Sequence, residues 1–218
     1  KAPVLMWFDV QAHCERACTV RHRYVMLSTR AETRGFEALL PDRLASVRQI
    51  GPTPVPVTAM PAPADAFRKL SQAYEGNLVA RMFAREGLHQ VSFSPELVAG
   101  PNQLEVQYRQ LMSVRGEGTE NVALGFIFDA STLAAWQRAE QFKATLKVTF
   151  GPGMLDVLKR IGMKADAVAV GCNVGGGKPI PADQMQRQPA SKDEIWMEFA
   201  GEAPSSIWCV FAAPGRTG

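Results

Sequence analysis

Residues 104–109 read Leu-Glu-Val-Gln-Tyr-Arg, an unbroken alternation of apolar and polar side chains. Successive side chains of a β-strand point to opposite faces of its sheet, so this period of two predicts a half-buried strand. Further upstream, Val4–Val10 and Arg23–Thr29 are short runs rich in strand-forming residues. They predict two more strands, which we expect to pair as a hairpin around the segment between them. A sheet is therefore expected at the centre of the fold.

Apolar residues at helical spacing predict that helices accompany this sheet. We expect helices over four segments: Phe36–Ile50 (one or two short helices), Ala64–Glu86, a stretch capped by Asp129 or Ser131 and reaching Leu146, and Met154–Ile161. We expect further strands over Asn121–Phe128, as the partner of residues 104–109, and over Ala165–Val170, Ile195–Phe199 and Ile207–Phe211. This irregular order favours an α+β fold with a mixed, largely antiparallel sheet and helices packed mainly on one face.

Length and composition are those of an ordinary globular chain. With 218 residues, 46% hydrophobic and 21% charged, we expect a single α+β domain over residues 1–218. Gly51–Pro63 holds five of the 15 prolines and predicts an extended crossing or linker. No apolar run approaches the roughly 18 to 20 residues that span a bilayer, and no secretory leader is recognisable. We therefore expect a soluble protein, either cytoplasmic or exported after removal of a leader.

The positive charge of the chain is concentrated near its amino terminus. Residues 1–50 hold eight Lys or Arg against five Asp or Glu, whereas the remainder holds sixteen of each. Arginine suits bidentate contacts to carboxylate or phosphate, and a tyrosine among arginines can stack on a base. The sequence therefore predicts a non-catalytic binding protein whose partner is an acidic protein surface or a nucleic acid. The candidate partner-binding residues are Arg16, Arg21, Arg23, Tyr24, Arg30 and Arg34.

Two histidines and two cysteines lie within ten residues, at His13, Cys14, Cys18 and His22. Thiolate and imidazole are common zinc ligands, so Cys14, Cys18 and His22 are candidate metal ligands. On a straight helix the first and last of these would be about 12 Å apart, so a shared metal requires a turn. A Cys14–Cys18 disulfide and a pair of ordinary thiols remain open as alternatives. No other cofactor is expected.

A catalytic alternative rests on Cys172. This cysteine follows a predicted apolar strand and precedes three consecutive glycines at 175–177, which could make room for a substrate. With His89 as the base it would act as the nucleophile of a cysteine-dependent hydrolase or transferase. The sequence contains no P-loop, dinucleotide-binding glycine motif, serine-hydrolase elbow or zinc-protease motif, and it resembles no family.

Overall fold

The computed structural model describes the chain except for residues 1, 43, 50–52, 66–86, 112, 116–122, 130–135, 154–155, 157–159, 161–168, 175–177, 180–184, 188–193, 201–205 and 213–218. The described residues are mostly in β-strands, and helical residues occur only at 64–65, 152–153, 156 and 160. The expectation of an α+β fold with helices packed on one face is therefore wrong. None of the helical residues described belongs to a helix long and apolar enough to cross a membrane.

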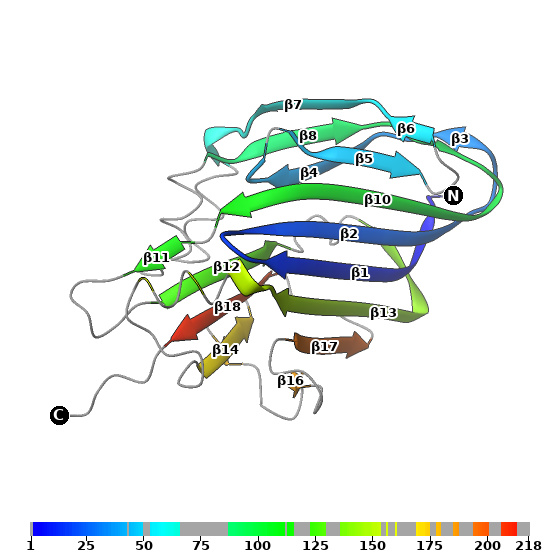
Figure 1. Cartoon of the computed structure of the whole chain (residues 1–218). Helices are drawn as coiled ribbons and strands as arrows, with labels where there is room; N and C mark the ends of the chain where they lie inside the picture. The colour runs from blue at the N-terminus through cyan, green and yellow to red at the C-terminus, as the bar shows by residue number, and fades with distance from the viewer. Residues whose placement is uncertain are drawn as a thin grey trace.

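An eight-stranded sheet occupies the middle of the molecule, with its long strands side by side (Figure 1). Its strand order is β16-β17-β13-β1-β2-β10-β5-β6. The strands are β1 (Val4–Cys14), β2 (Ala17–Ser28), β5 (Ser46–Gln49), β6 (Thr53–Val55), β10 (Gly100–Leu111), β13 (Gln137–Phe150), β16 (Met185–Arg187) and β17 (Glu194–Ala200). β1 and β2 form an antiparallel hairpin, as the two amino-terminal runs predict. β1 and β13 pair in parallel, whereas the other pairs of this sheet are antiparallel.

Three smaller sheets complete the described structure. A three-stranded sheet has the order β4-β8-β7, from β4 (Phe36–Leu40), β8 (His89–Phe93) and β7 (Val57–Pro61). A five-stranded sheet has the order β11-β12-β18-β14-β15, from β11 (Ser113–Arg115), β12 (Ala123–Asp129), β18 (Ser206–Ala212), β14 (Ala169–Val174) and β15 (Lys178–Pro179). β3 (Glu32–Thr33) pairs with β9 (Glu96–Leu97). In Figure 1 the three-stranded sheet lies above the long strands, and β12, β18 and β14 lie at the lower left.

Strand pairing corrects one partner predicted from the sequence. β12 covers most of the segment expected to pair with residues 104–109, but its partners are β11 and β18. β10 pairs instead with β2 and β5. A strand's own pattern shows which face it buries, but it does not identify the neighbour.

The two helical predictions that fall on described residues are wrong for a common reason. Phe36–Ile50 contains β4 and β5, and β4 buries every second residue, Phe36, Ala38 and Leu40. The segment ending at Leu146 contains β13, in which every second residue from Phe142 to Val148 is apolar and buried. In both segments a period of two fits the burial better than helical spacing does. The helices expected at 64–86 and 154–161 lie largely outside the described residues, as does most of the strand expected at 165–170.

The eight-stranded sheet has a core face and a polar face. Along β2 the side chains of Val20, His22, Tyr24 and Met26 are buried in the core, whereas those of Arg21 and Arg23 point to the other side. Trp136 stacks on Tyr24 at 5.7 Å between ring centroids and on Phe36 of the three-stranded sheet at 4.6 Å. The two sheets therefore share one core. We call the opposite side of the eight-stranded sheet, which carries Arg21 and Arg23, the outer face.

A disulfide bond joins Cys14 to Cys18 across the tip of the β1–β2 hairpin. The two residues are register partners at the end of the paired strands, with their Cα atoms 4.0 Å apart. Of the three alternatives left open by the sequence, the structure contains the disulfide.

Candidate functional site

Three arginines from two strands converge on one buried carboxylate at the outer face. Glu105 of β10 has a side chain only 2% exposed, and Arg48 of β5 donates to its Oε1 from Nε at 2.7 Å and also pairs with it through Nη2. From β2, Arg21 Nε lies 3.6 Å and Arg23 Nη2 lies 3.9 Å from Glu105 Oε2. One carboxylate thus holds three guanidinium groups, and we call Arg21, Arg23 and Arg48 the outer-face arginine cluster.

The register of the sheet explains why these side chains meet. Thr145, Asp9, Arg23, Glu105 and Arg48 are opposite one another in neighbouring strands, so they form one row across β13, β1, β2, β10 and β5. Directly opposed residues share a face of the sheet, and opposite charges in such positions attract. Asp9 also accepts a hydrogen bond from Thr145 Oγ1 at 2.5 Å. Acid and arginine therefore alternate along the central part of the row.

A shallow groove lies beside the arginine cluster on the same face. It has a volume of about 140 Å³, and Gln11, His13, Arg21, Lys147 and Thr149 are among the residues that line it. His13 Nδ1 lies 2.9 Å from the Thr149 hydroxyl. Arg21 belongs both to the groove and to the cluster, so the two are continuous. Cationic, amide and hydroxyl groups in one groove suit the binding of a carboxylate or phosphate oxygen.

The structure separates the six predicted partner-binding residues. Arg21 and Arg23 lie together on the outer face, and Arg16 is exposed at the tip of the hairpin. Tyr24 points to the opposite face and is 5% exposed, stacked on Trp136 in the core. It therefore cannot join the neighbouring arginines in a contact with a partner.

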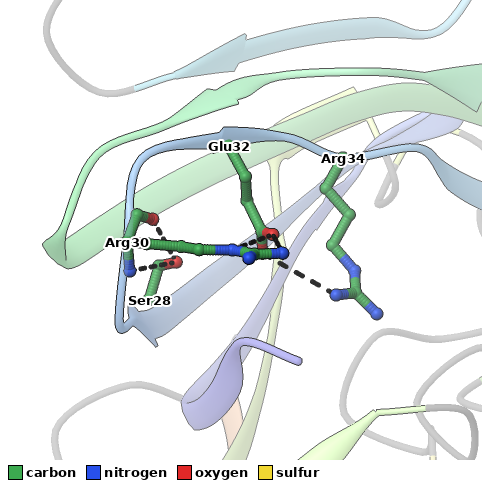
Figure 2. Close-up of polar contacts among 4 residues, drawn as sticks. All are labelled: Ser28, Arg30, Glu32 and Arg34. Carbon is green, nitrogen blue, oxygen red and sulfur yellow. Dashed lines mark hydrogen bonds and ion pairs between the residues drawn. The ribbon is translucent and has the colours of Figure 1, made fainter. Parts of the chain in front are cut away.

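Arg30 and Arg34 lie beyond the other end of β2, around a different carboxylate (Figure 2). Arg30 Nε and Nη2 are each 3.1 Å from Glu32 Oε2, and Arg34 Nη1 is 3.8 Å from Oε1. The Ser28 hydroxyl donates to the carbonyl of Arg30 at 2.7 Å and fixes the bend of the chain. We call Arg30, Arg34 and Glu32 the corner cluster. It is a second, separate arginine group.

Sequence reasoning missed Arg48, Glu105, Asp9 and Lys147. Glu105 was placed correctly on the polar side of a strand, but its burial depends on the arginines of two other strands. The only sequence signal was the repeated alternation along each strand, which identifies faces and leaves the order of the strands open.

A larger cavity of about 640 Å³ lies beside the corner cluster. Its walls include the rings of Phe36, Phe93 and Trp136, and Arg34 and Glu37 carry opposite charges among its lining residues. The aromatic walls resemble those of many small-molecule sites. Because its two charges cancel, this cavity is not where an acidic partner would be attracted.

His22 occupies the core face and is held in a neutral form. Its Nε2 lies 3.1 Å from the Tyr108 hydroxyl and its Nδ1 lies 3.4 Å from the Tyr24 hydroxyl. Burial lowers the pKa of His22 from 6.5 to about 3. The charged form is disfavoured because the core cannot replace its hydration.

The arrangement does not fit the zinc site considered for Cys14, Cys18 and His22. The two sulfur atoms are bonded to each other, so neither is a thiolate that could bind a metal. His22 is four residues further along β2 than Cys18, about 13 Å away along an extended strand. No group of three or more His, Cys, Asp or Glu side chains suited to a metal occurs among the residues the structure describes.

The catalytic alternative, Cys172 with His89, gains no support from the described geometry. His89 begins β8 of the three-stranded sheet, whereas Cys172 lies in β14 of the five-stranded sheet. The Cys172 side chain lies outside the described part of the structure. The His89 Nδ1 atom is buried, and among the residues that the structure describes no hydrogen-bond partner for it is found.

Comparisons with known proteins identify no family. No family model matches the sequence, and no match was found among curated proteins. Among solved structures, an M1 zinc metallopeptidase from Deinococcus radiodurans has a TM-score of 0.40 and 8% identity, and the match covers 97% of this chain but 42% of the metallopeptidase. A protein from Legionella pneumophila, whose nutrient-binding role is itself only proposed, has a TM-score of 0.47 and 7% identity over 95% of this chain and 66% of that protein. These values support no conclusion about the family or activity of this chain.

Proposed function

We propose that this chain is a non-catalytic binding protein that holds an acidic protein segment against the outer face of its eight-stranded sheet, at the outer-face arginine cluster. The observation that carries the proposal is the convergence of Arg21, Arg23 and Arg48 on the single buried carboxylate of Glu105.

Glu105 gives these arginines fixed positions without occupying all of their donors. Each guanidinium has five N–H donors, and a carboxylate has only two acceptor oxygens. The side chains of Arg21, Arg23 and Arg48 remain 41%, 29% and 60% exposed. Because the arginines are held in place before binding, they would lose less side-chain entropy when they pair with a partner carboxylate.

Within the row from Thr145 to Arg48, the partly exposed charges are positive. The two acids of the row, Asp9 and Glu105, are buried, whereas the three arginines are partly exposed. Lys147 adds a further cation at the adjoining groove. Cations at the surface above buried acids would attract an acidic segment and orient it along the row.

Apolar side chains next to the cluster favour a protein segment over a nucleic acid. Trp7 is 39% exposed and lies opposite Val25 on the outer face, and Leu27, further along β2, is 42% exposed. A peptide can place apolar side chains against this patch and carboxylates against the arginines. Tyr24, the residue predicted to stack on bases, is unavailable because it is buried in the core.

The test is the binding of a fluorescent peptide that carries both glutamates and leucines, measured by anisotropy at two salt concentrations. We expect the Arg21→Gln/Arg23→Gln protein to bind about tenfold more weakly than the unchanged protein, and we expect added salt to reduce the difference. The matched control is Arg30→Gln/Arg34→Gln, which removes the same charge from the corner cluster and should leave the affinity within about twofold.

Two results would overturn the proposal. Equal losses of affinity in the two double variants would show that net charge, and not the outer-face cluster, governs binding. Tighter binding of a single-stranded oligonucleotide than of the peptide, with the same dependence on Arg21 and Arg23, would make nucleic acid the partner. Circular dichroism of both variants verifies that they are folded.

A further inference from the structure

The register of the five-stranded sheet sets two cysteines directly opposite each other. In the antiparallel pair β14–β18, Cys172 is the partner of Cys209, between the pairs Gly171–Val210 and Asn173–Trp208. The chain has four cysteines, and the other two, Cys14 and Cys18, are also register partners. All four cysteines therefore occur as opposed pairs on neighbouring strands.

We propose that Cys172 and Cys209 form a second disulfide bond, which fastens β14 to β18. Directly opposed residues of an antiparallel pair share a face of the sheet and have Cα atoms about 4.5 to 5.5 Å apart. Disulfides bridge Cα atoms separated by about 4.4 to 6.8 Å. The backbone thus places the two residues within bridging range with no change in register.

The Cys14–Cys18 disulfide is an independent reason to expect this bond. Structural disulfides form and persist in oxidising compartments and are rare where glutathione and thioredoxin keep thiols reduced. A protein that carries the first disulfide has met conditions that also oxidise a second opposed pair. The two bonds together account for every cysteine in the chain.

The reaction is thiol–disulfide exchange with an oxidant that itself carries a disulfide, such as oxidised glutathione. The thiolate of one cysteine attacks this disulfide, forms a mixed disulfide and releases one reduced thiol. The second cysteine then attacks the mixed disulfide, the protein S–S bond forms and a second reduced thiol leaves. The protein loses two hydrogens, as two protons and two electrons, and the oxidant gains them.

This bond has a functional consequence. A sulfur atom that is bonded to another sulfur is not a thiolate, so Cys172 cannot act as a nucleophile while the disulfide is intact. The bond would also link β14 to β18, which are adjacent in the five-stranded sheet. Along the chain these two strands are separated by the segment from β15 to β17.

The experiment is intact and peptide mass spectrometry of the full chain refolded in a glutathione redox buffer, with iodoacetamide added before and after reduction. We expect the oxidised protein to take up no label and to be about 4 Da lighter than the reduced protein, since two disulfides remove four hydrogens. A non-reduced digest should contain a peptide pair that joins Cys172 to Cys209.

The Cys14→Ser/Cys18→Ser protein isolates the second pair, and we expect it to be about 2 Da lighter when oxidised and to resist labelling. The matched Cys172→Ser/Cys209→Ser protein retains the hairpin disulfide and calibrates the same shift. Labelling of Cys172 and Cys209 in the oxidised, folded wild-type chain would overturn the proposal. A disulfide that links Cys172 or Cys209 to Cys14 or Cys18 would also overturn it. The digest of the wild-type chain identifies the linked cysteines even if a variant fails to fold.

Discussion

His22 and Arg23 are neighbours on β2 but belong to opposite faces of the same sheet. Arg23 lies on the outer face, where it approaches the buried carboxylate of Glu105. His22 lies in the core, neutral and within reach of two tyrosine hydroxyls. The comparison shows two ways to accommodate polar side chains on one strand: opposite charges where water still reaches the side chains, and neutral groups where it does not.

The largest effect on stability should come from lowering the pH of the solution, because the core face holds His22 in its neutral form. The folded protein keeps His22 neutral down to a pKa of about 3, whereas an unfolded chain protonates this residue near 6.5. Between these values the unfolded state binds more protons, so stability falls as the pH falls. The loss approaches about 5 kcal/mol as the pH falls below 3.

Urea unfolding between pH 7 and pH 4 measures this slope. His22→Gln, which has no titrating ring, should be less stable at pH 7 but should lose less stability over that range. If the unfolding free energies of both proteins change equally with pH, the titration of His22 does not govern acid sensitivity. The core face would then not depend on His22 staying neutral, contrary to the comparison with Arg23.

The next effect concerns the centre of the outer face. Glu105→Gln keeps the size of the side chain but leaves Arg21, Arg23 and Arg48 without their shared anion. Breaking a buried ion pair costs about 3 to 5 kcal/mol, and the partial exposure of these arginines should reduce the cost to about 2 kcal/mol.

The urea midpoint of Glu105→Gln measures this loss, with Glu140→Gln, which removes the same charge at an exposed position of β13, as the charge control. A loss below about 0.5 kcal/mol would mean that the cluster is as weak as an ordinary surface ion pair. It would then lack the fixed geometry on which the proposed binding function depends.

A smaller effect is expected at the end of the same row. Thr145→Val removes the hydroxyl that donates to the buried carboxylate of Asp9 and preserves the shape of the side chain. A buried acceptor deprived of its donor costs about 1 to 2 kcal/mol. Thr149→Val is the matched control, because Thr149 is on the same strand and its contact with His13 is exposed. Equal thermal shifts in the two variants would show that burial of Asp9 adds nothing.

How far the sequence predicts this fold can be judged from two strands. β10 is predictable from the sequence, because residues 104–109 alternate strictly and the side chains of Leu104, Val106 and Tyr108 are apolar and buried. β13 has the same alternation over residues 142–149, but Leu133, Trp136, Phe142 and Leu146 also fit a helical spacing. The structure shows that the alternation is the correct signal, and a neighbouring parallel strand, β1, stabilises it. No local pattern reveals that neighbour.

The candidate site was predictable only in part, for the same reason. The excess of arginine near the amino terminus pointed to Arg21 and Arg23, and alternation along β2 could have separated them from Tyr24. Their convergence on Glu105 depends on the register between β2, β10 and β5, which joins residues far apart in the chain. The corner cluster is more local, since Glu32 is only two residues from Arg30 and two residues from Arg34.

The smallest effect is expected at this corner cluster, which is the exposed counterpart of the outer-face cluster. Glu32→Gln leaves Arg30 and Arg34 without their anion, as Glu105→Gln does for three arginines, but Arg30 is 69% exposed and can be hydrated instead. Exposed ion pairs contribute about 0.2 to 1 kcal/mol, and salt screens them, so the loss in urea midpoint should be small and should vanish at 1 M salt. If Glu32→Gln destabilises the protein as much as Glu105→Gln, then exposure does not set the strength of these clusters, and the bend at Ser28 depends on Glu32 for its conformation.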